Sequence, residues 1–191
     1  MNICVYGASS VKTSEKYISE TEILGKEFAL RGHGLVFGAG AAGVMGASAR
    51  GAKEGGGKII GIAPEFFNVD GMIFEECTKL IRPDTMRDRK QMLDELSDAF
   101  IMAPGGIGTF DEFFEILTLK QLSRHTKAIA IFNVDGYFDD LIHLLQRAVD
   151  EKFMKAESLE LYKVFEEVEP MLDYLEEYVP VDLDILNFKN I

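Results

Sequence analysis

Two hydrophobic patterns alternate along the chain. Short apolar runs bounded by glycine, proline or charged residues are typical of strands buried on both faces of a parallel sheet. They predict strands at residues 2–6, 35–37, 58–62, 78–81, 99–102 and 128–132. Between these runs, apolar residues spaced three and four apart predict helices at residues 14–31, 43–53, 85–96, 109–122, 137–152 and 168–178.

This alternation predicts an α/β fold with an open parallel sheet and helices on both of its faces. The chain has 191 residues, 47% of them hydrophobic, which is enough for one good core. No long linker or repeat divides it. We therefore expect one domain over residues 1–179, followed by an irregular tail over residues 180–191 that packs on another surface or another subunit.

The net charge of the chain limits the kinds of partner that it can bind. A net charge of −12 argues against binding a nucleic-acid polymer or an anionic membrane. The exception is a basic cluster between residues 79 and 90, which suits a small phosphorylated ligand. No apolar stretch is long enough to span a membrane, and residues 1–6 resemble a strand more than a signal peptide. Cys4 and Cys77 lack the spacing of a metal site and indicate buried thiols in a reducing cytoplasm.

The segment PGGIGTFDE, from Pro104 to Glu112, has the features of an anion site. It follows a strand, contains Gly105, Gly106 and Gly108, and leads into a helix. Glycines let backbone N–H groups approach a phosphate, and the helix N-terminus adds about half a positive charge. A helix that needed only a cap would not need three glycines.

Glu112 has two interpretations. As an acid in the first helical turn it would complement the helix dipole. It also shares a helical stripe with Thr109, Ile116 and Leu119, which directs it inward or into a cleft. Asp111 can serve the dipole from the solvent side, so we favour a functional role for Glu112, with its charged form stabilised by neighbouring N–H groups.

Arg89 and Lys90 also lie on an apolar stripe, with Met86, Leu93 and Leu96. A charge on a core-facing stripe must be paired or line a cleft. A guanidinium suits a phosphate or a planar base. We expect Arg89 and Lys90 to face the ligand, and Lys79, Arg82 and Arg87 to be surface charges.

Two more glycine loops, at residues 7–10 and 38–46, fall at carboxyl ends of strands, where open sheets bind ligands. They bring Ser9, Gly40 and Gly43 into the candidate site. Residues 38–43 read GxGxxG, which allows a dinucleotide-dependent redox enzyme as one alternative. The acid expected about 20 residues later is missing, since the first candidate, Glu65, follows a proline. No Walker, GxSxG or HExxH pattern occurs, and we expect no metal.

The segments MRDRK (Met86–Lys90) and PGGIGTFDE together resemble the Lonely Guy family of cytokinin riboside 5′-monophosphate phosphoribohydrolases, often labelled possible lysine decarboxylases. GAGAAGVMG, ICVYGASS and NVDGYFDDLI extend the resemblance over about residues 3–165. It implies a Rossmann-like homodimer that releases a free base and ribose 5-phosphate from a nucleoside 5′-monophosphate, without cofactor or metal. No lysine stands in a recognisable pyridoxal-phosphate setting.

By position, the resemblance assigns catalysis to Arg89 and Glu112. It places the phosphate on the loop Gly105, Gly106, Ile107, Gly108 and Thr109, with Asp111, Thr118 and Lys90 nearby. This chain has Ile107 and Asp111 where the family pattern has tyrosine and glutamate, which leaves the preferred base open between prenylated adenine, adenine and another purine. A second alternative is a carrier of a nucleotide or phosphorylated cofactor, without catalysis.

The helix at 109–122 also indicates assembly. Its apolar residues occupy nearly every side: Phe110, Phe113, Phe114, Ile116, Leu117 and Leu119. One sheet covers only one side of such a helix. We therefore expect a second subunit to cover the rest.

Overall fold

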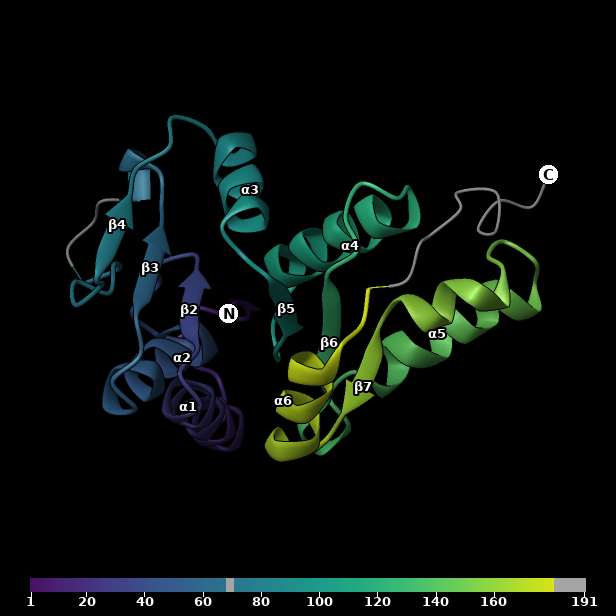
Figure 1. Cartoon of the computed structure of the whole chain (residues 1–191), viewed down its shortest axis with the longest axis horizontal. Coiled ribbons are helices and arrows are strands. Elements are labelled where there is room, and N and C mark those ends of the chain that lie inside the picture. Colours follow the sequence, from purple (N-terminus) through teal and green to yellow (C-terminus); the bar gives the residue numbers. More distant parts are fainter. Residues whose placement is uncertain (68–70, 181–191) are drawn as a thin grey trace.

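The computed structural model describes residues 1–67 and 71–180, which form one parallel sheet flanked by helices (Figure 1). Its seven strands lie in the order β4-β3-β2-β1-β5-β6-β7. The strands are β1 (Asn2–Tyr6), β2 (Gly34–Phe37), β3 (Ile59–Ile62), β4 (Lys79–Ile81), β5 (Ala99–Met102), β6 (Ala128–Phe132) and β7 (Lys163–Phe165). Every pairing is parallel, which confirms the predicted fold class.

Helices cover both faces of the sheet. They are α1 (Glu15–Leu30), α2 (Gly43–Glu54), α3 (Met86–Glu95), α4 (Ile107–Gln121), α5 (Asp139–Asp150) and α6 (Val168–Glu177). In Figure 1, α1, α2 and α6 lie below the sheet, whereas α3, α4 and α5 lie above it and to the right. Three short 3-10 turns, at Glu65–Phe67, Val134–Gly136 and Ala156–Leu161, complete the described elements.

Each face of the sheet has its own core. In β1, Ile3 and Val5 pack against Leu24 and Phe28 of α1 on one face, whereas the alternate residues face α3 and α4 on the other. This alternation is the two-residue period of a strand, and burial on both faces explains why these strands read as unbroken apolar runs.

The order of the strands creates a crevice between β1 and β5. The chain moves outward from β1 through β2, β3 and β4, then returns to the other side of β1 with β5. The loops after β1 and β5 therefore diverge to opposite sides, which is where open α/β sheets bind ligands. The two loops are joined by a hydrogen bond from the Ala8 N–H to the Pro104 carbonyl (3.1 Å).

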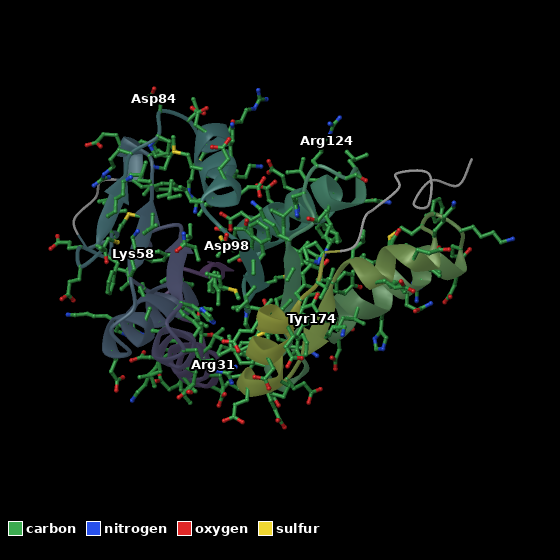
Figure 2. The ribbon with its side chains drawn as sticks, in the orientation of Figure 1. Arg31, Lys58, Asp84, Asp98, Arg124 and Tyr174 are labelled. Atoms are coloured by element: carbon green, nitrogen blue, oxygen red, sulfur yellow. The ribbon has the colours of Figure 1, made fainter. Side chains whose placement is uncertain are left out.

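Ion pairs join the C-terminal end of α1 to α6. Arg31, which follows α1 and is labelled in Figure 2, contacts Asp173 (2.6 Å) and Glu176 (3.2 Å) of α6. These contacts fix the last helix on the face that α1 and α2 cover. No helix within residues 1–67 and 71–180 is long and apolar enough to cross a membrane.

Several predicted elements need correction. Strand β7 was not predicted, because it is a three-residue edge strand whose first two residues are exposed. The helix predicted at 137–152 begins at Asp139, because Asp135 and Gly136 turn the backbone through positive φ values (51° and 69°). Helix α4 begins at Ile107 instead of Thr109, which moves Glu112 out of the first turn. The predicted tail lies almost entirely outside the described residues.

Candidate functional site

A buried ion pair between α3 and α4 forms the centre of the candidate site. Arg89 Nη1 donates a hydrogen bond to Glu112 Oε1 (2.6 Å), and Arg89 Nε donates to the Ile62 carbonyl at the end of β3 (3.2 Å). The two residues are only 6% and 8% exposed. Burying two charges is costly unless they pair, so their mutual contact explains how both tolerate this position.

Gly38, in the loop after β2, makes room for this arginine. A Cβ atom at Gly38 would lie 2.0 Å from Arg89 Nη2. Because Nη1 and Nε are both bonded, the guanidinium cannot simply swing away. Gly38, the first glycine of the GxGxxG pattern, therefore leaves the space that the Arg89 side chain of α3 occupies. The sequence did not reveal this role, since Gly38 and Arg89 are distant in the chain.

The glycine loops converge on one cavity of about 420 Å³, which we call the loop pocket. The candidate residues that line it come from three separate segments: Ser9, Arg89, Gly106, Gly108, Thr109, Asp111 and Glu112. Met45, Phe67 and Met86 supply apolar walls. The pocket thus combines the N-terminus of α4, a glycine loop and a carboxylate.

The N-terminus of α4 supplies the donors of the loop pocket. Gly106 is the N-cap residue, and because glycine has no side chain it makes no side-chain capping bond. The N–H groups of the first helical turn have no acceptor within their own helix, so they are available to an anion. A Cβ at Gly106 or Gly108 would meet no atom within 4 Å, which leaves open space beside this backbone.

Glu112 lies in the second turn of α4, and its pKa shifts in the opposite direction to the one predicted. Burial raises the pKa of Glu112 above its usual 4.5, against the opposing charge and hydrogen bond of Arg89. The helix dipole fades beyond the first turn, so it does not offset the loss of water here. Arg89, not the helix N-terminus, is the group that stabilises the carboxylate.

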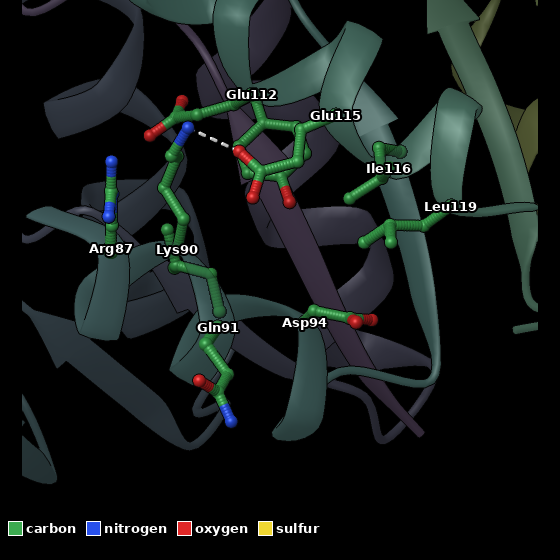
Figure 3. A pocket seen from close by; sticks show the side chains of 10 residues that line it. Arg87, Lys90, Gln91, Asp94, Glu112, Glu115, Ile116 and Leu119 are labelled. Atoms are coloured by element: carbon green, nitrogen blue, oxygen red, sulfur yellow. Dashed lines mark ion pairs between the residues drawn. The ribbon is translucent and has the colours of Figure 1, made fainter. Parts of the chain in front are cut away.

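Glu112 also borders a second cavity, between α3 and α4, of about 450 Å³, which we call the helix pocket (Figure 3). Leu93, Ile116 and Leu119 form its apolar side. Lys90 reaches across it to ion-pair with Glu115, drawn as a dashed line in Figure 3, and with Asp111 (3.2 Å). The glutamate therefore stands between two cavities, one bordered by the backbone donors at the start of α4 and the other by charged and apolar side chains of α3 and α4.

The remaining candidate residues lie around these cavities. Gly40 lines a neighbouring cavity together with Arg89, and Gly105 lines another one behind the glycine loop. Gly43 is buried at the start of α2, where its φ of +61° and close contacts to the Ala8 and Ser10 carbonyls leave no space for a side chain. Its role in the structure is therefore to shape the loop.

Two further candidates, Ile107 and Thr118, line neither the loop pocket nor the helix pocket. Ile107 is 87% exposed and points to solvent. Thr118 is exposed as well and is not among the residues that line the loop pocket. Thr118 lies nine positions after Thr109 along α4, a rise of about 13.5 Å. The structure thus offers no support for contact between Thr118 and an anion at the glycine loop.

Several residues that border the cavities were not predicted as site residues. Tyr6, at the end of β1, lines the helix pocket, and Arg87, which is exposed as expected of a surface charge, borders it as well. Met45 lines the loop pocket, and its sulfur accepts a hydrogen bond from the Gly40 N–H (3.1 Å). The position of Tyr6 at the carboxyl end of the central strand was the available signal for its placement.

Metal ligation has no obvious basis in this arrangement. Within residues 1–67 and 71–180, no group of three or more His, Cys, Asp or Glu side chains could hold an ion. Cys4 and Cys77 are free, and burial raises the pKa of their thiols to about 12 and about 11. These thiols are therefore not nucleophiles near neutral pH.

The arrangement suits a substrate that carries an anionic group and develops positive charge nearby. Backbone donors at the start of α4 would bind the anion, and the carboxylate of Glu112 would stabilise a cation beside it. Such charge develops on a sugar ring when a glycosidic bond breaks.

Comparisons with known proteins agree with this chemistry. Residues 45–175 match the family model described as "Possible lysine decarboxylase". The chain is 34% identical over 185 residues to cytokinin riboside 5'-monophosphate phosphoribohydrolase LOG2 of Arabidopsis thaliana, which covers 97% of the chain and 87% of that relative. It is also 34% identical to the probable enzyme LOGL3 of Oryza sativa subsp. japonica, over 93% of the chain and 84% of that relative.

Solved structures share the fold. The Moco carrier protein from Chlamydomonas reinhardtii superposes with a TM-score of 0.69 at 23% identity, over 92% of this chain and 95% of that one. The molybdenum cofactor binding protein from Rippkaea orientalis gives 0.67 at 20% identity, over 92% and 93%. At such identities the likeness concerns the fold and not the ligand.

Proposed function

Because the chain belongs to the Lonely Guy family of cytokinin riboside 5′-monophosphate phosphoribohydrolases, we propose that it hydrolyses the N-glycosidic bond of purine riboside 5′-monophosphates. The products are a free base and ribose 5-phosphate. The substrate is a cytokinin-type nucleotide or AMP. No cofactor is needed, since water is the only other reactant.

The observation that carries this proposal is the position of Glu112. Its carboxylate borders both the loop pocket and the helix pocket. We assign the 5′-phosphate to the backbone N–H groups of Gly106, Gly108 and Thr109, which leaves the ribose beside the carboxylate. Arg89 holds that carboxylate in place through its bond to Oε1.

The reaction follows from where charge develops. As the bond between C1′ and the base nitrogen breaks, its electron pair moves to the base and the ribose becomes cation-like. The carboxylate of Glu112 stabilises that cation and orients a water molecule toward C1′. The hydroxide part of the water joins C1′, and the proton neutralises the departing base.

A carrier of nucleotides or phosphorylated cofactors is the less favoured alternative. The molybdenum-cofactor proteins resemble this chain below 25% identity, so they support only the shared fold. A pure carrier would also not need a buried carboxylate fixed by an arginine at the junction of two cavities.

The direct test is to incubate the purified protein with AMP and with isopentenyladenosine 5′-monophosphate, and to measure the free base by chromatography. We expect base release from at least one of them. The matching ribosides without phosphate should react far more slowly, because the binding energy of the glycine loop is lost. Equal rates on nucleotide and nucleoside would refute the phosphate assignment.

A cytoplasmic homodimer is part of the proposal. Phe114 of α4 and Leu122, the C-cap of that helix, are each 38% exposed, although the other side of α4 is buried against the sheet. A two-fold contact would cover these residues. The two free thiols suit a reducing compartment. Light scattering should give about twice the mass of 21.3 kDa, and a stable monomer at micromolar concentration would contradict the dimer.

A further inference from the structure

The segment after β6 forms a rigid turn beside the glycine loop. Asn133 Oδ1 accepts the Phe138 N–H (2.6 Å), and its Nδ2 donates to Asp139 Oδ1 (2.8 Å). Gly136 has a φ of +69°, which strains any other residue, and a Cβ there would lie 2.7 Å from Asp139 Oδ2. This turn leaves the backbone at Tyr137 little freedom.

The turn presents the hydroxyl of Tyr137 to the glycine loop. Tyr137 Oη donates a hydrogen bond to the carbonyl oxygen of Gly105 (2.8 Å). Its ring is held edge-on by Tyr17 (centroids 5.2 Å apart) and by Phe138 (4.9 Å). Tyr137 is nevertheless 40% exposed, so core packing does not explain this position.

The bond to Gly105 has a consequence on the opposite side of the peptide. In a trans peptide, the C=O of one residue and the N–H of the next point in opposite directions. No cis peptide bond occurs within the described residues. When Tyr137 holds the Gly105 carbonyl, the Gly106 N–H is directed to the other side of the loop, and Gly106 lines the loop pocket.

The neighbouring peptide is fixed in the same way. The Pro104 carbonyl accepts the Ala8 N–H (3.1 Å). Two successive carbonyls before the helix are thus held by partners from other loops. Glycine peptides that lack such bonds rotate easily, because no Cβ restricts their backbone.

We propose that Tyr137 is a positioning residue for anion binding: its hydroxyl holds the Gly105 carbonyl, which keeps the Gly106 N–H directed at the anion in the loop pocket. The inference rests on the proposed function in that this anion is the 5′-phosphate of the substrate. Tyr137 itself does not touch the substrate. It acts through the orientation of one peptide unit.

The test is Tyr137→Phe, which keeps the ring and its contacts and removes only the hydroxyl. Binding of ribose 5-phosphate is measured by calorimetry, and hydrolysis of the nucleotide substrate by base release. We expect the affinity for ribose 5-phosphate to fall about fivefold, the effect of one ordinary hydrogen bond. KM should rise by a similar factor, while kcat and the melting temperature stay nearly unchanged. Tyr17→Phe, which removes a hydroxyl from the adjacent ring, is the matched control and should leave the affinity for ribose 5-phosphate and the KM unchanged.

Each outcome decides between the hypotheses. Unchanged affinity for ribose 5-phosphate in Tyr137→Phe would overturn the positioning role. A fall in kcat and melting temperature alongside the affinity would also overturn it, because that pattern indicates a structural role. Failure of the unaltered protein to bind ribose 5-phosphate would overturn both the assignment of the phosphate to the glycine loop and the role of Tyr137. If the unaltered protein binds ribose 5-phosphate but hydrolyses no nucleotide, weaker binding by Tyr137→Phe still supports the role of Tyr137, and only the proposed reaction fails.

Discussion

Arg89 and Glu112 form an ion pair of 2.6 Å that joins α3 to α4 beside the crevice between β1 and β5. Residues 23 positions apart thus form one unit. An anionic substrate that approaches Glu112 meets a compensated charge and not a bare carboxylate. In the proposed function, this pairing would let the carboxylate and the phosphate occupy neighbouring positions.

The first prediction concerns catalysis by Glu112. In Glu112→Gln the side chain keeps its size but loses the charge that, in the proposed reaction, faces the ribose cation. We expect turnover to fall about a hundredfold or more, since the lost interaction acts chiefly in the transition state. Binding of ribose 5-phosphate should persist or tighten. Single-turnover base release and calorimetry measure the two effects, and undiminished turnover would return Glu112 to a structural role.

The second prediction concerns the stability of the same pair. Removing one partner leaves a buried charge uncompensated, so Arg89→Met and Glu112→Gln should each lower the free energy of unfolding by about 3 kcal/mol. The double variant should lose less than the sum of the two, because it leaves no unpaired charge. Urea denaturation of the four proteins gives the coupling energy. Additive losses would mean that the pair does not act as a unit.

The third prediction concerns Gly38. A methyl group in Gly38→Ala would displace the Arg89 guanidinium and break its pair with Glu112, so we expect activity to fall at least tenfold in protein that is still folded, and stability to fall by no more than the cost of the broken pair, about 3 kcal/mol. Gly46→Ala is the contrasting variant, since its Cβ would lie 2.0 Å from the Ala41 carbonyl oxygen, which is backbone. It should lose stability and activity together. Melting temperature and base release distinguish the two patterns.

The fourth prediction concerns Lys120, a buried lysine of α4. The residue is 1% exposed, and its Nζ has no hydrogen-bond partner among the described residues, although it lies 4.8 Å from the centroid of the Tyr178 ring. Burial lowers the pKa of Lys120 from 10.5 to about 8. Below pH 8 the folded protein therefore bears the cost of a buried ammonium, which the unfolded chain does not.

Lys120→Met should consequently be more stable than the unaltered protein at pH 7, by roughly 1–3 kcal/mol. Between about pH 8 and pH 10.5 the folded protein releases the proton before the unfolded chain does, so the cost fades and the gain should shrink. Denaturation at pH 7 and pH 10 measures this difference. Lys127→Met, which removes the partner of Asp94 (2.8 Å), should instead be destabilising. A gain that is independent of pH would rule out the ionisation argument.

The sequence determined the architecture because local patterns carry it. Parallel strands buried on both faces must be apolar throughout, so β1, β5 and β6 could be placed to the residue. The same patterns placed Arg89 and Glu112 inward, because each shares a helical stripe with apolar residues. Strand β7 escaped prediction because a short, half-exposed edge strand has no such pattern.

Only the tertiary structure decided how the site is assembled. It brought Gly38 beneath Arg89, paired Arg89 with Glu112, and placed the hydroxyl of Tyr137 on the Gly105 carbonyl. It also reversed the expected direction of the Glu112 pKa shift, since desolvation depends on neighbours from every packed element. Contacts between residues far apart in the chain leave no periodic trace in sequence, because they depend on where the order of the strands brings separate loops together.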